Sequence, residues 1–193
     1  ELEGTGFSID DFGLKGFVTY TEKQIIWDRK DGIQFKTPSG KIEFISSMLE
    51  DAGYQSFPEY ESMPSPPEGK FRLITGRCAL HTHISTQNNP YLNEIVPENV
   101  LWINDQKAEQ LGISNGSRVE VSSKCGSGTI KALVTDLIQP EAVFLLHGFG
   151  HQATAATRSF DKGLSHSLLT ENISDMIGGS PAMHDTFVSI KPA

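Results

Sequence analysis

Short apolar runs recur along the last two thirds of the chain and predict β-strands. Residues Arg118–Ser122 alternate between polar and apolar side chains, which is typical of a strand with one buried face. Ala142–Leu146 is apolar throughout, so we expect a strand that is buried on both faces. Further strands are predicted over residues 71–74, 100–104, 129–134 and 186–190. Five or six short strands separated by turns, with few helices, favour a β-barrel.

Two short helices are also predicted. The first is expected over residues 46–51, where a serine can cap its N-terminus. The second is expected over residues 106–111, with Asp105 as its N-cap and Gly112 directly after its last residue.

The N-terminal third has a different character from the barrel region. Two alternating segments, Ile33–Lys36 and Lys41–Ile45, flank a Thr-Pro-Ser-Gly sequence, which predicts a hairpin with a type I turn. Four of the ten prolines lie between Phe57 and Gly69, and such a stretch is extended rather than folded. We therefore divide the chain into an N-terminal segment, residues 1–69, and a barrel domain, residues 70–193.

The composition narrows the class of protein. The net charge of −8 disfavours a nucleic-acid or anionic-membrane partner, and no apolar run approaches the roughly 18 residues that span a bilayer. The sequence begins at Glu1 rather than Met, and we interpret it as a fragment of a longer protein. Cys78 and Cys125 are the only cysteines, and we expect both thiols to be buried and unreactive.

Three clusters of polar residues lie next to predicted strands and form the candidate binding site. The first, Thr75–Pro90, directly follows a strand and holds a cation, two imidazoles, hydroxyls and side-chain amides. The second, His147–His151, begins where the buried strand ends, and the third is Asn172–Asp175. Such donors and acceptors suit a large, flat, polar ligand with anionic groups. Alternatively, these loops are solvated and cap their own turns.

The order of these motifs resembles that of a known family. TGR-x-x-x-H-T-H-x-x-T-Q-N, then P-E-N-V-L-W-I-N and then V-F-L-L-H-G-F-G-H are similar to the C-terminal cofactor-binding domain of the molybdopterin oxidoreductases, the dimethyl sulfoxide reductase superfamily. The resemblance covers about residues 33–193. The most similar subgroup is the thiosulfate/polysulfide reductases, followed by the respiratory arsenate reductases.

This resemblance implies a mainly β (α+β) fold, a double-psi β-barrel with short helices and an irregular N-terminal extension. It implies that the domain binds molybdopterin guanine dinucleotide, while molybdenum and a 4Fe-4S cluster are ligated by parts of the subunit outside this chain. The parent enzyme would be a thiosulfate or polysulfide reductase of anaerobic respiration, or alternatively a respiratory arsenate reductase. Its partners would be the remaining domains of the same subunit, on which residues 1–69 pack, an iron–sulfur electron-transfer subunit and a membrane anchor subunit. Its location would be the periplasm.

By the same resemblance, a set of residues is assigned to contact with the cofactor. In the first cluster they are Thr75, Gly76, Arg77, His81, His83, Thr86, Gln87 and Asn88. In the later clusters they are His147, Gly148, Asn172 and Asp175. The Arg77 guanidinium suits the anionic diphosphate, although it could instead pair with a surface carboxylate. His81 and His83 would point to opposite faces of an extended segment, so we expect only one of them to contact the cofactor.

Two alternatives come from other classes of protein. The chain could be a stand-alone β-barrel that binds a small polar ligand without redox chemistry. The other alternative is a metallohydrolase with zinc on His81, His83 and His147. No HExxH helix in the sequence supports this alternative. The remaining histidines are interpreted as surface or packing residues: His151, His166 and His184. The cofactor hypothesis requires Arg77, His147 and Asn172 to meet at one barrel mouth.

Overall fold

The structure is a computed structural model of the chain, and it describes residues 2–3, 5–18, 32–33, 35–57 and 59–193. The chain divides into two compact units, Glu1–Ser62 and Met63–Ala193. The division falls inside the Pro-rich stretch, before the predicted boundary after residue 69.

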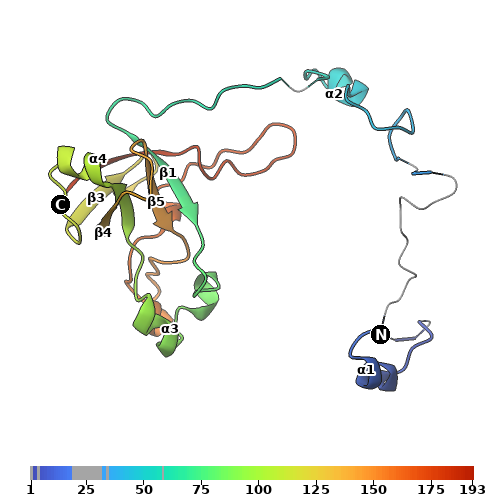
Figure 1. Cartoon of the computed structure of the whole chain (residues 1–193), viewed down its shortest axis with the longest axis horizontal. Helices are drawn as coiled ribbons and strands as arrows, with labels where there is room; N and C mark the ends of the chain where they lie inside the picture. The colour runs from blue at the N-terminus through green and yellow to red at the C-terminus, as the bar shows by residue number, and fades with distance from the viewer. Residues whose placement is uncertain (1, 4, 19–31, 34, 58) are drawn as a thin grey trace. The chain divides into compact units, whose positions relative to one another are not determined.

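The first unit contains two short helices, α1 (Ile9–Lys15) and α2 (Ser47–Asp51), which Figure 1 labels. The sequence reasoning missed α1, although Ser8 and Asp11 begin it with a capping box in which the Ser8 backbone N–H donates to the Asp11 carboxylate at 2.9 Å. The predicted helix over residues 46–51 is confirmed as α2. Not one of the described residues of this unit is buried.

The predicted hairpin over residues 33–45 is wrong. Its turn is present, because the Gly40 N–H donates to the Thr37 carbonyl at 3.0 Å. The flanking segments are not strands over the described residues, and Gln34 lies outside those residues. An isolated two-stranded hairpin is marginal without a sheet or helix to pack against, and both segments are exposed here.

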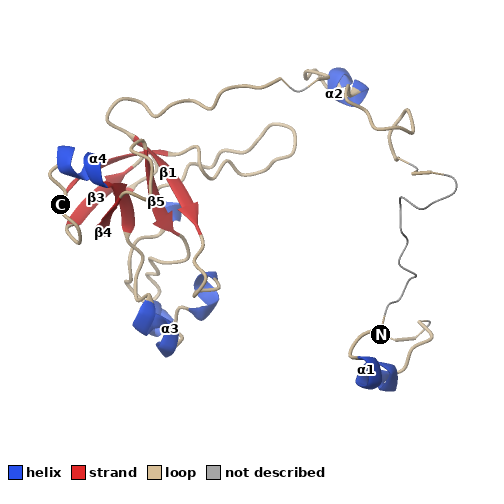
Figure 2. Ribbon diagram, viewed as in Figure 1, coloured by secondary structure: helices blue, strands red, loops and turns tan. Residues whose placement is uncertain are grey.

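The second unit is a closed barrel of six strands in the order β1-β5-β2-β4-β3-β6. The strands, drawn as arrows in Figures 1 and 2, are β1 (Phe71–Gly76), β2 (Leu101–Asn104), β3 (Arg118–Ser122), β4 (Ser127–Thr135), β5 (Ala142–Leu146) and β6 (Phe187–Pro192). β1 pairs with β5 in parallel and β2 pairs with β4 in parallel, while the other neighbours are antiparallel. This barrel, accompanied only by short helices, confirms the predicted mainly β, double-psi-like fold.

Alternating side chains fill the barrel interior. In β1 the odd-numbered residues are buried, and in β3 Val119 and Val121 are both fully buried, as the alternation predicted. β5 contributes Val143 and Leu145 to the same core, while Phe144 is only half-buried. Burial of one such aliphatic side chain stabilises the fold by about 1.5–3 kcal/mol.

Short helices connect the strands: η2 (His83–Thr86), α3 (Pro90–Ile95), α4 (Asp105–Gln110), η3 (Thr154–Ser159) and η4 (His166–Leu168). The predicted N-cap of α4 is wrong, because the Asn104 side chain, not Asp105, occupies that position. Its Oδ1 atom accepts from the backbone N–H groups of Gln106 and Lys107 at 3.1 and 3.4 Å. Within the described ranges, no helix is long and apolar enough to cross a bilayer.

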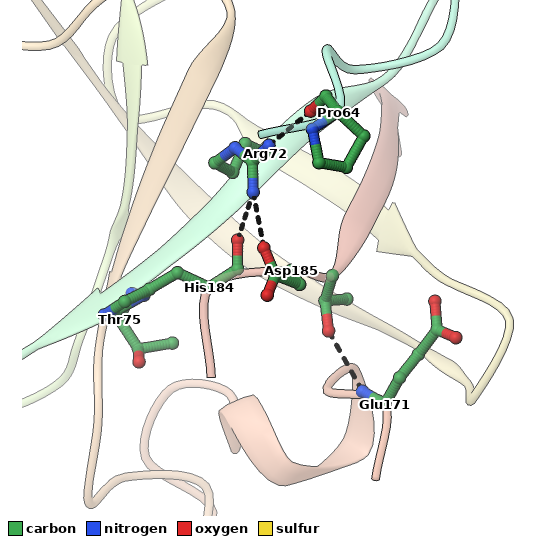
Figure 3. Close-up of polar contacts among 7 residues, drawn as sticks. Pro64, Arg72, Thr75, Glu171, His184 and Asp185 are labelled. Atoms are coloured by element: carbon green, nitrogen blue, oxygen red, sulfur yellow. Dashed lines mark hydrogen bonds and ion pairs between the residues drawn. The ribbon is translucent and has the colours of Figure 1, made fainter. Parts of the chain in front are cut away.

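A polar clasp ties β1 to the segments that flank the barrel (Figure 3). Arg72 Nη1 donates to the His184 carbonyl at 2.7 Å and lies 2.9 Å from Asp185 Oδ1, and Arg72 Nη2 donates to the Pro64 carbonyl. The guanidinium also lies 5.0 Å from the ring centroid of Phe187. We call Arg72, His184 and Asp185 the arginine clasp.

The expectation for the two cysteines is wrong. Cys78 is half-buried and Cys125 is exposed, and both are free thiols. Cys125 lies in the short turn between β3 (which ends at Ser122) and β4 (which begins at Ser127), outside the barrel core.

Candidate functional site

The parallel pairing of β1 and β5 brings the first two polar clusters together. In this register Gly76 lies beside Leu146, so both strands end at the same edge of the sheet. The His147 N–H donates to the Gly76 carbonyl at 3.1 Å and continues the pairing into the loops. Gly76 lets the Phe144 ring pack against the strand backbone, because a Cβ atom would lie 2.6 Å from that ring and would force it to shift.

Three imidazoles from the two loops and from η4 lie in a row, with His147 tilted by 53° against His83 and edge-on to His166. The ring centroids of His83 and His147 lie 3.9 Å apart, and those of His147 and His166 lie 5.6 Å apart. We call these three residues the histidine stack. Arg77 and Cys78 line a small pocket with His83 and His147, so a permanent cation borders the stack.

This environment favours neutral imidazoles. Burial lowers the pKa of His147, and the charges of His83, His166 and Arg77 lower it further. Burial likewise lowers the pKa of His166, with a smaller effect from His83. At neutral pH both rings are therefore uncharged, and each retains one nitrogen that can donate and one that can accept.

Several buried polar atoms around the stack have no hydrogen-bond partner among the described residues. We call them the open polar atoms: Thr75 Oγ1, Gln87 Nε2, Gln87 Oε1, His147 Nε2 and His166 Nδ1. Gln87 is 1% exposed, so its amide is withdrawn from water and still unsatisfied. An unsatisfied buried polar group costs about 1–3 kcal/mol, so each of these atoms is a candidate partner for a bound water molecule or a ligand group.

The third cluster reaches this site through Asn172. A cavity of about 340 Å³ is lined by both His166 and Asn172, and the His166 ring lies edge-on to that of His147. Arg77 and His147 line a separate, smaller pocket, so a meeting of Arg77, His147 and Asn172 at one barrel mouth stays a prediction. Asp175 is different, because its carboxylate accepts backbone N–H groups of its own turn, at 3.0 Å from Ile177, 2.6 Å from Gly178 and 2.6 Å from Ser180.

Three other predicted site residues have protein partners. His81 is buried, with Nδ1 lying 3.3 Å from Thr86 Oγ1 and Nε2 lying 3.0 Å from the Val96 carbonyl. Thr86 Oγ1 also accepts from the Thr82 N–H at 2.9 Å, and Asn88 Oδ1 accepts from the Ser159 N–H at 3.0 Å. These contacts hold the first loop in shape.

The engagement of His81 also bears on the zinc alternative. A zinc site on His81, His83 and His147 would need the His81 ring nitrogens that Thr86 and Val96 already occupy. Across the described ranges no group of three or more His, Cys, Asp or Glu side chains is arranged to hold a metal ion.

Glycines allow the loops to approach closely. Gly148 has φ +91°, and a Cβ atom there would lie 3.1 Å from the His83 carbonyl carbon and 3.2 Å from Gln87 Nε2. Its role is to admit the first loop against the second. Gly150, with φ +80°, is closer still, because a Cβ atom would lie 2.1 Å from the Ser165 nitrogen.

The sequence reasoning missed Asn99, which fastens this end of the barrel. Asn99 is 2% exposed, and its Nδ2 donates to the carbonyls of Leu146 and Leu164 at 2.6 and 2.9 Å. Its Oδ1 accepts from the Leu164 N–H at 2.9 Å. Asn99 is the asparagine of the P-E-N-V motif. Its position directly before an apolar strand was the signal that the sequence offered.

Comparison with known proteins identifies the class to which this barrel belongs. The family model described as "Molydopterin dinucleotide binding domain" matches residues 71–187, from the first residue of β1 to the first residue of β6. The match covers more than half of the chain, and the chain belongs to this family of molybdopterin dinucleotide-binding domains.

Individual relatives agree with the family. The thiosulfate reductase molybdopterin-containing subunit PhsA of Salmonella typhimurium (strain LT2) is 32% identical over 163 residues, covering 83% of this chain and 21% of that protein. The arsenate respiratory reductase molybdopterin-containing subunit ArrA of Chrysiogenes arsenatis is 27% identical over 202 residues, covering 92% and 24%. The chain thus spans about a fifth to a quarter of the length of these curated relatives.

Among solved structures, acetylene hydratase from Pelobacter acetylenicus matches 98% of this chain and 28% of its own chain, with a TM-score of 0.78 and 19% sequence identity. This is a likeness of fold.

The residues of the site fit the cofactor that the family binds. The open polar atoms of Gln87 and Thr75 offer donors and acceptors to a heterocycle edge, and Arg77 offers a cation to a phosphate. The predicted cofactor, molybdopterin guanine dinucleotide, is confirmed by family membership. Which of the predicted side chains contact it stays a prediction.

Proposed function

We propose that this chain is the cofactor-binding domain at the C-terminal end of the catalytic subunit of a molybdenum-dependent oxidoreductase. The observation that carries the proposal is the group of open polar atoms where the β1 and β5 loops meet. An amide and two imidazole nitrogens are buried there without a protein partner, and a bound molecule that hydrogen-bonds to them stabilises the fold.

Within this proposal each group has a physical task. Arg77 neutralises phosphate charge, the Gln87 amide pairs with the pterin edge, and the histidine stack forms one wall of the site. Asn172 extends the wall through the cavity that it shares with His166. When bound, the cofactor supplies a molybdenum centre for two-electron removal of an oxygen or sulfur atom from a substrate.

The substrate that we propose is thiosulfate or polysulfide. Support comes from the 32% identity to a protein named as a thiosulfate reductase subunit. The parent subunit would work with an iron–sulfur electron-transfer subunit and a membrane anchor subunit in the periplasm. Residues 1–69 would pack on the other domains of the subunit, since exposed apolar side chains such as Ile9 and Phe44, each 78% exposed, need a surface to cover them.

A second candidate is a respiratory arsenate reductase. The alignment to the arsenate respiratory reductase subunit of Chrysiogenes arsenatis covers 92% of this chain, more than the 83% covered by the thiosulfate reductase subunit. The sequence identity of this relative to the chain is lower, at 27%, so we rank arsenate reduction second.

The test begins with the full-length subunit purified under anaerobic conditions. We expect molybdenum and guanine nucleotide in a ratio of about one metal to two nucleotides, since a molybdenum centre in this superfamily carries two dinucleotides. Arg77→Ala should lower the retained nucleotide, whereas Arg118→Ala on β3, which is also an exposed arginine, should leave it unchanged. A wild-type subunit without guanine nucleotide would contradict the cofactor role.

Turnover assays then separate the substrates. With a reduced dye as the donor of the two electrons, we expect the loaded subunit to convert thiosulfate to sulfide and sulfite, and we expect no reduction by the 193-residue chain alone. Arsenate reduction without thiosulfate reduction would replace the first candidate by the second.

A further inference from the structure

His166 is a feature of the site that the sequence reasoning assigned to the surface or to packing. It begins η4, its ring centroid lies 5.6 Å from that of His147, and its Nδ1 is buried with no partner in the described part of the chain. The same residue lines the cavity that contains Asn172. His166 therefore lies between the second polar cluster and the third, and one of its nitrogens is buried without a hydrogen-bond partner among the described residues.

The charged groups around the histidine stack carry more positive than negative charge. Arg77 borders His147 at the end of β1, together with Cys78 and His81. On the other side Glu171 lines the cavity of His166, but its carboxylate lies 3.5 Å from the Lys124 ammonium group. In the absence of a ligand His147 and His166 are neutral, because burial and the neighbouring imidazoles lower the pKa of both.

Building on the proposed function, we propose that His166 is a further cofactor-binding residue, and that the stack gains one proton from solvent when the anionic dinucleotide binds. A bound phosphate or other anionic oxygen reverses the local potential that disfavours an imidazolium ion. Once protonated, an imidazole donates from both nitrogens, so His166, which lines the cavity, becomes a charge-assisted donor to the ligand. No covalent bond other than the new N–H bond is formed.

The direction of the pH dependence follows from this linkage. The pKa of the responsive imidazole is higher in the loaded protein than in the empty protein. The loaded form is therefore favoured as the pH falls through the interval between the two values. Uptake of one proton changes the affinity by at most about tenfold per pH unit.

The experiment follows the loss of cofactor from the full-length loaded subunit at pH 6, 7 and 8 under anaerobic conditions. Guanine nucleotide and molybdenum remaining on the protein are quantified after gel filtration, without any activity assay. We expect the wild-type subunit to lose nucleotide roughly three- to tenfold more slowly at pH 6 than at pH 8, which is below the limit of about a hundredfold that linkage to one proton sets over two pH units.

Two variants at one position separate charge from shape. His166→Asn keeps a side-chain amide near the place of Nδ1 and cannot take up a proton, so it should match the wild type at pH 8 and lose the gain at pH 6. His166→Ala should lose nucleotide faster at every pH. Leu168→Ser is the control, because Leu168 belongs to the same η4 turn and is 51% exposed; it should keep the wild-type pH profile.

The outcomes distinguish this inference from the proposed function. A wild-type subunit that never carries guanine nucleotide contradicts the proposed function. A loaded wild type whose loss of nucleotide does not depend on pH overturns proton uptake, whether or not the variants fold. A normal pH profile in His166→Asn, or a flattened one in Leu168→Ser, overturns the role of His166.

Discussion

Two polar clusters flank strand β1, and they differ in how far the protein itself satisfies them. In the arginine clasp, Arg72 has partners in the His184 carbonyl, the Asp185 carboxylate and the Pro64 carbonyl (Figure 3). At the end of the same strand, the open polar atoms of Gln87 and the histidine stack have donors and acceptors to spare. Both clusters contain histidine, and what distinguishes them is whether their polar atoms have protein partners.

The difference teaches how to separate a structural polar cluster from a binding site. A cluster whose polar atoms all have protein partners indicates a structural role, because removing one partner leaves the others unpaired and lowers the stability of the fold. A buried cluster with open polar atoms is a candidate binding site, because those atoms do not stabilise the fold by themselves. Thr75 links the two clusters, since its N–H donates to His184 Nδ1 at 3.3 Å while its Oγ1 is an open polar atom.

The largest expected effect comes from a buried amide that the protein satisfies completely. Asn99→Leu removes three hydrogen bonds to the backbone of Leu146 and Leu164, so we expect the free energy of unfolding to fall by about 3 kcal/mol. Urea unfolding of the 193-residue chain, followed by tryptophan fluorescence, measures this change. A loss below about 1 kcal/mol would show that satisfaction of a buried amide does not mark a structural role here.

A smaller loss of stability is expected from the arginine clasp. Arg72→Ala should reduce the free energy of unfolding by about 1–2 kcal/mol, because the carbonyl of His184 and the carboxylate of Asp185 lose a charged donor. The nucleotide content of the full-length subunit should stay at the wild-type value. Loss of nucleotide in a variant that still folds would show that the clasp contributes to the binding site. It would contradict the distinction between a structural cluster and a binding cluster.

Gln87→Met is the matched counterpart of the Asn99 variant. It replaces an open amide by an apolar side chain of similar shape, so we expect the stability of the 193-residue chain to stay within about 1 kcal/mol of wild type or to rise. The full-length subunit should nevertheless retain several-fold less guanine nucleotide. Stability as strongly reduced as in Asn99→Leu would reveal a structural role for Gln87.

The smallest effect is expected at Asp175. Backbone N–H groups of Gly178, Ser180 and Ile177 lower the pKa of its carboxyl group. Because the folded-state pKa lies below the unfolded value, the stabilisation of the turn is present above the unfolded value and is lost as the pH falls through the folded one. Asp175→Asn should speed amide exchange at these three residues at neutral pH and leave global unfolding unchanged. Unchanged exchange would show that the carboxylate does not organise the turn.

The sequence predicted the barrel strands well because each carries a local signal. Arg118–Ser122 and Ala142–Leu146 were predicted with the observed bounds, since alternation and continuous apolar character depend only on neighbouring residues. The hairpin over residues 33–45 failed for the opposite reason. Its alternation was present, but strand formation needs a surface to pack on.

The candidate site was predicted in its residue types and only partly in their roles. Gln87 and His147 carry open polar atoms, whereas His81, Thr86 and Asn88 hold the loop through protein contacts. All five residues are polar and lie in the predicted polar clusters, so the sequence alone does not separate their roles. Their roles depend on which partner each one meets across the loops, and no local pattern encodes that.

By itself, then, the sequence determined the strand pattern and, through the order of its motifs, the family and the cofactor. Only the tertiary structure decided that β1 and β5 lie side by side, that the histidine stack forms between their loops, and that His166 joins it. Strand and loop partners are chosen by contacts between residues far apart in the chain. The satisfaction of a buried polar atom is a property of those contacts and not of the residue that carries it.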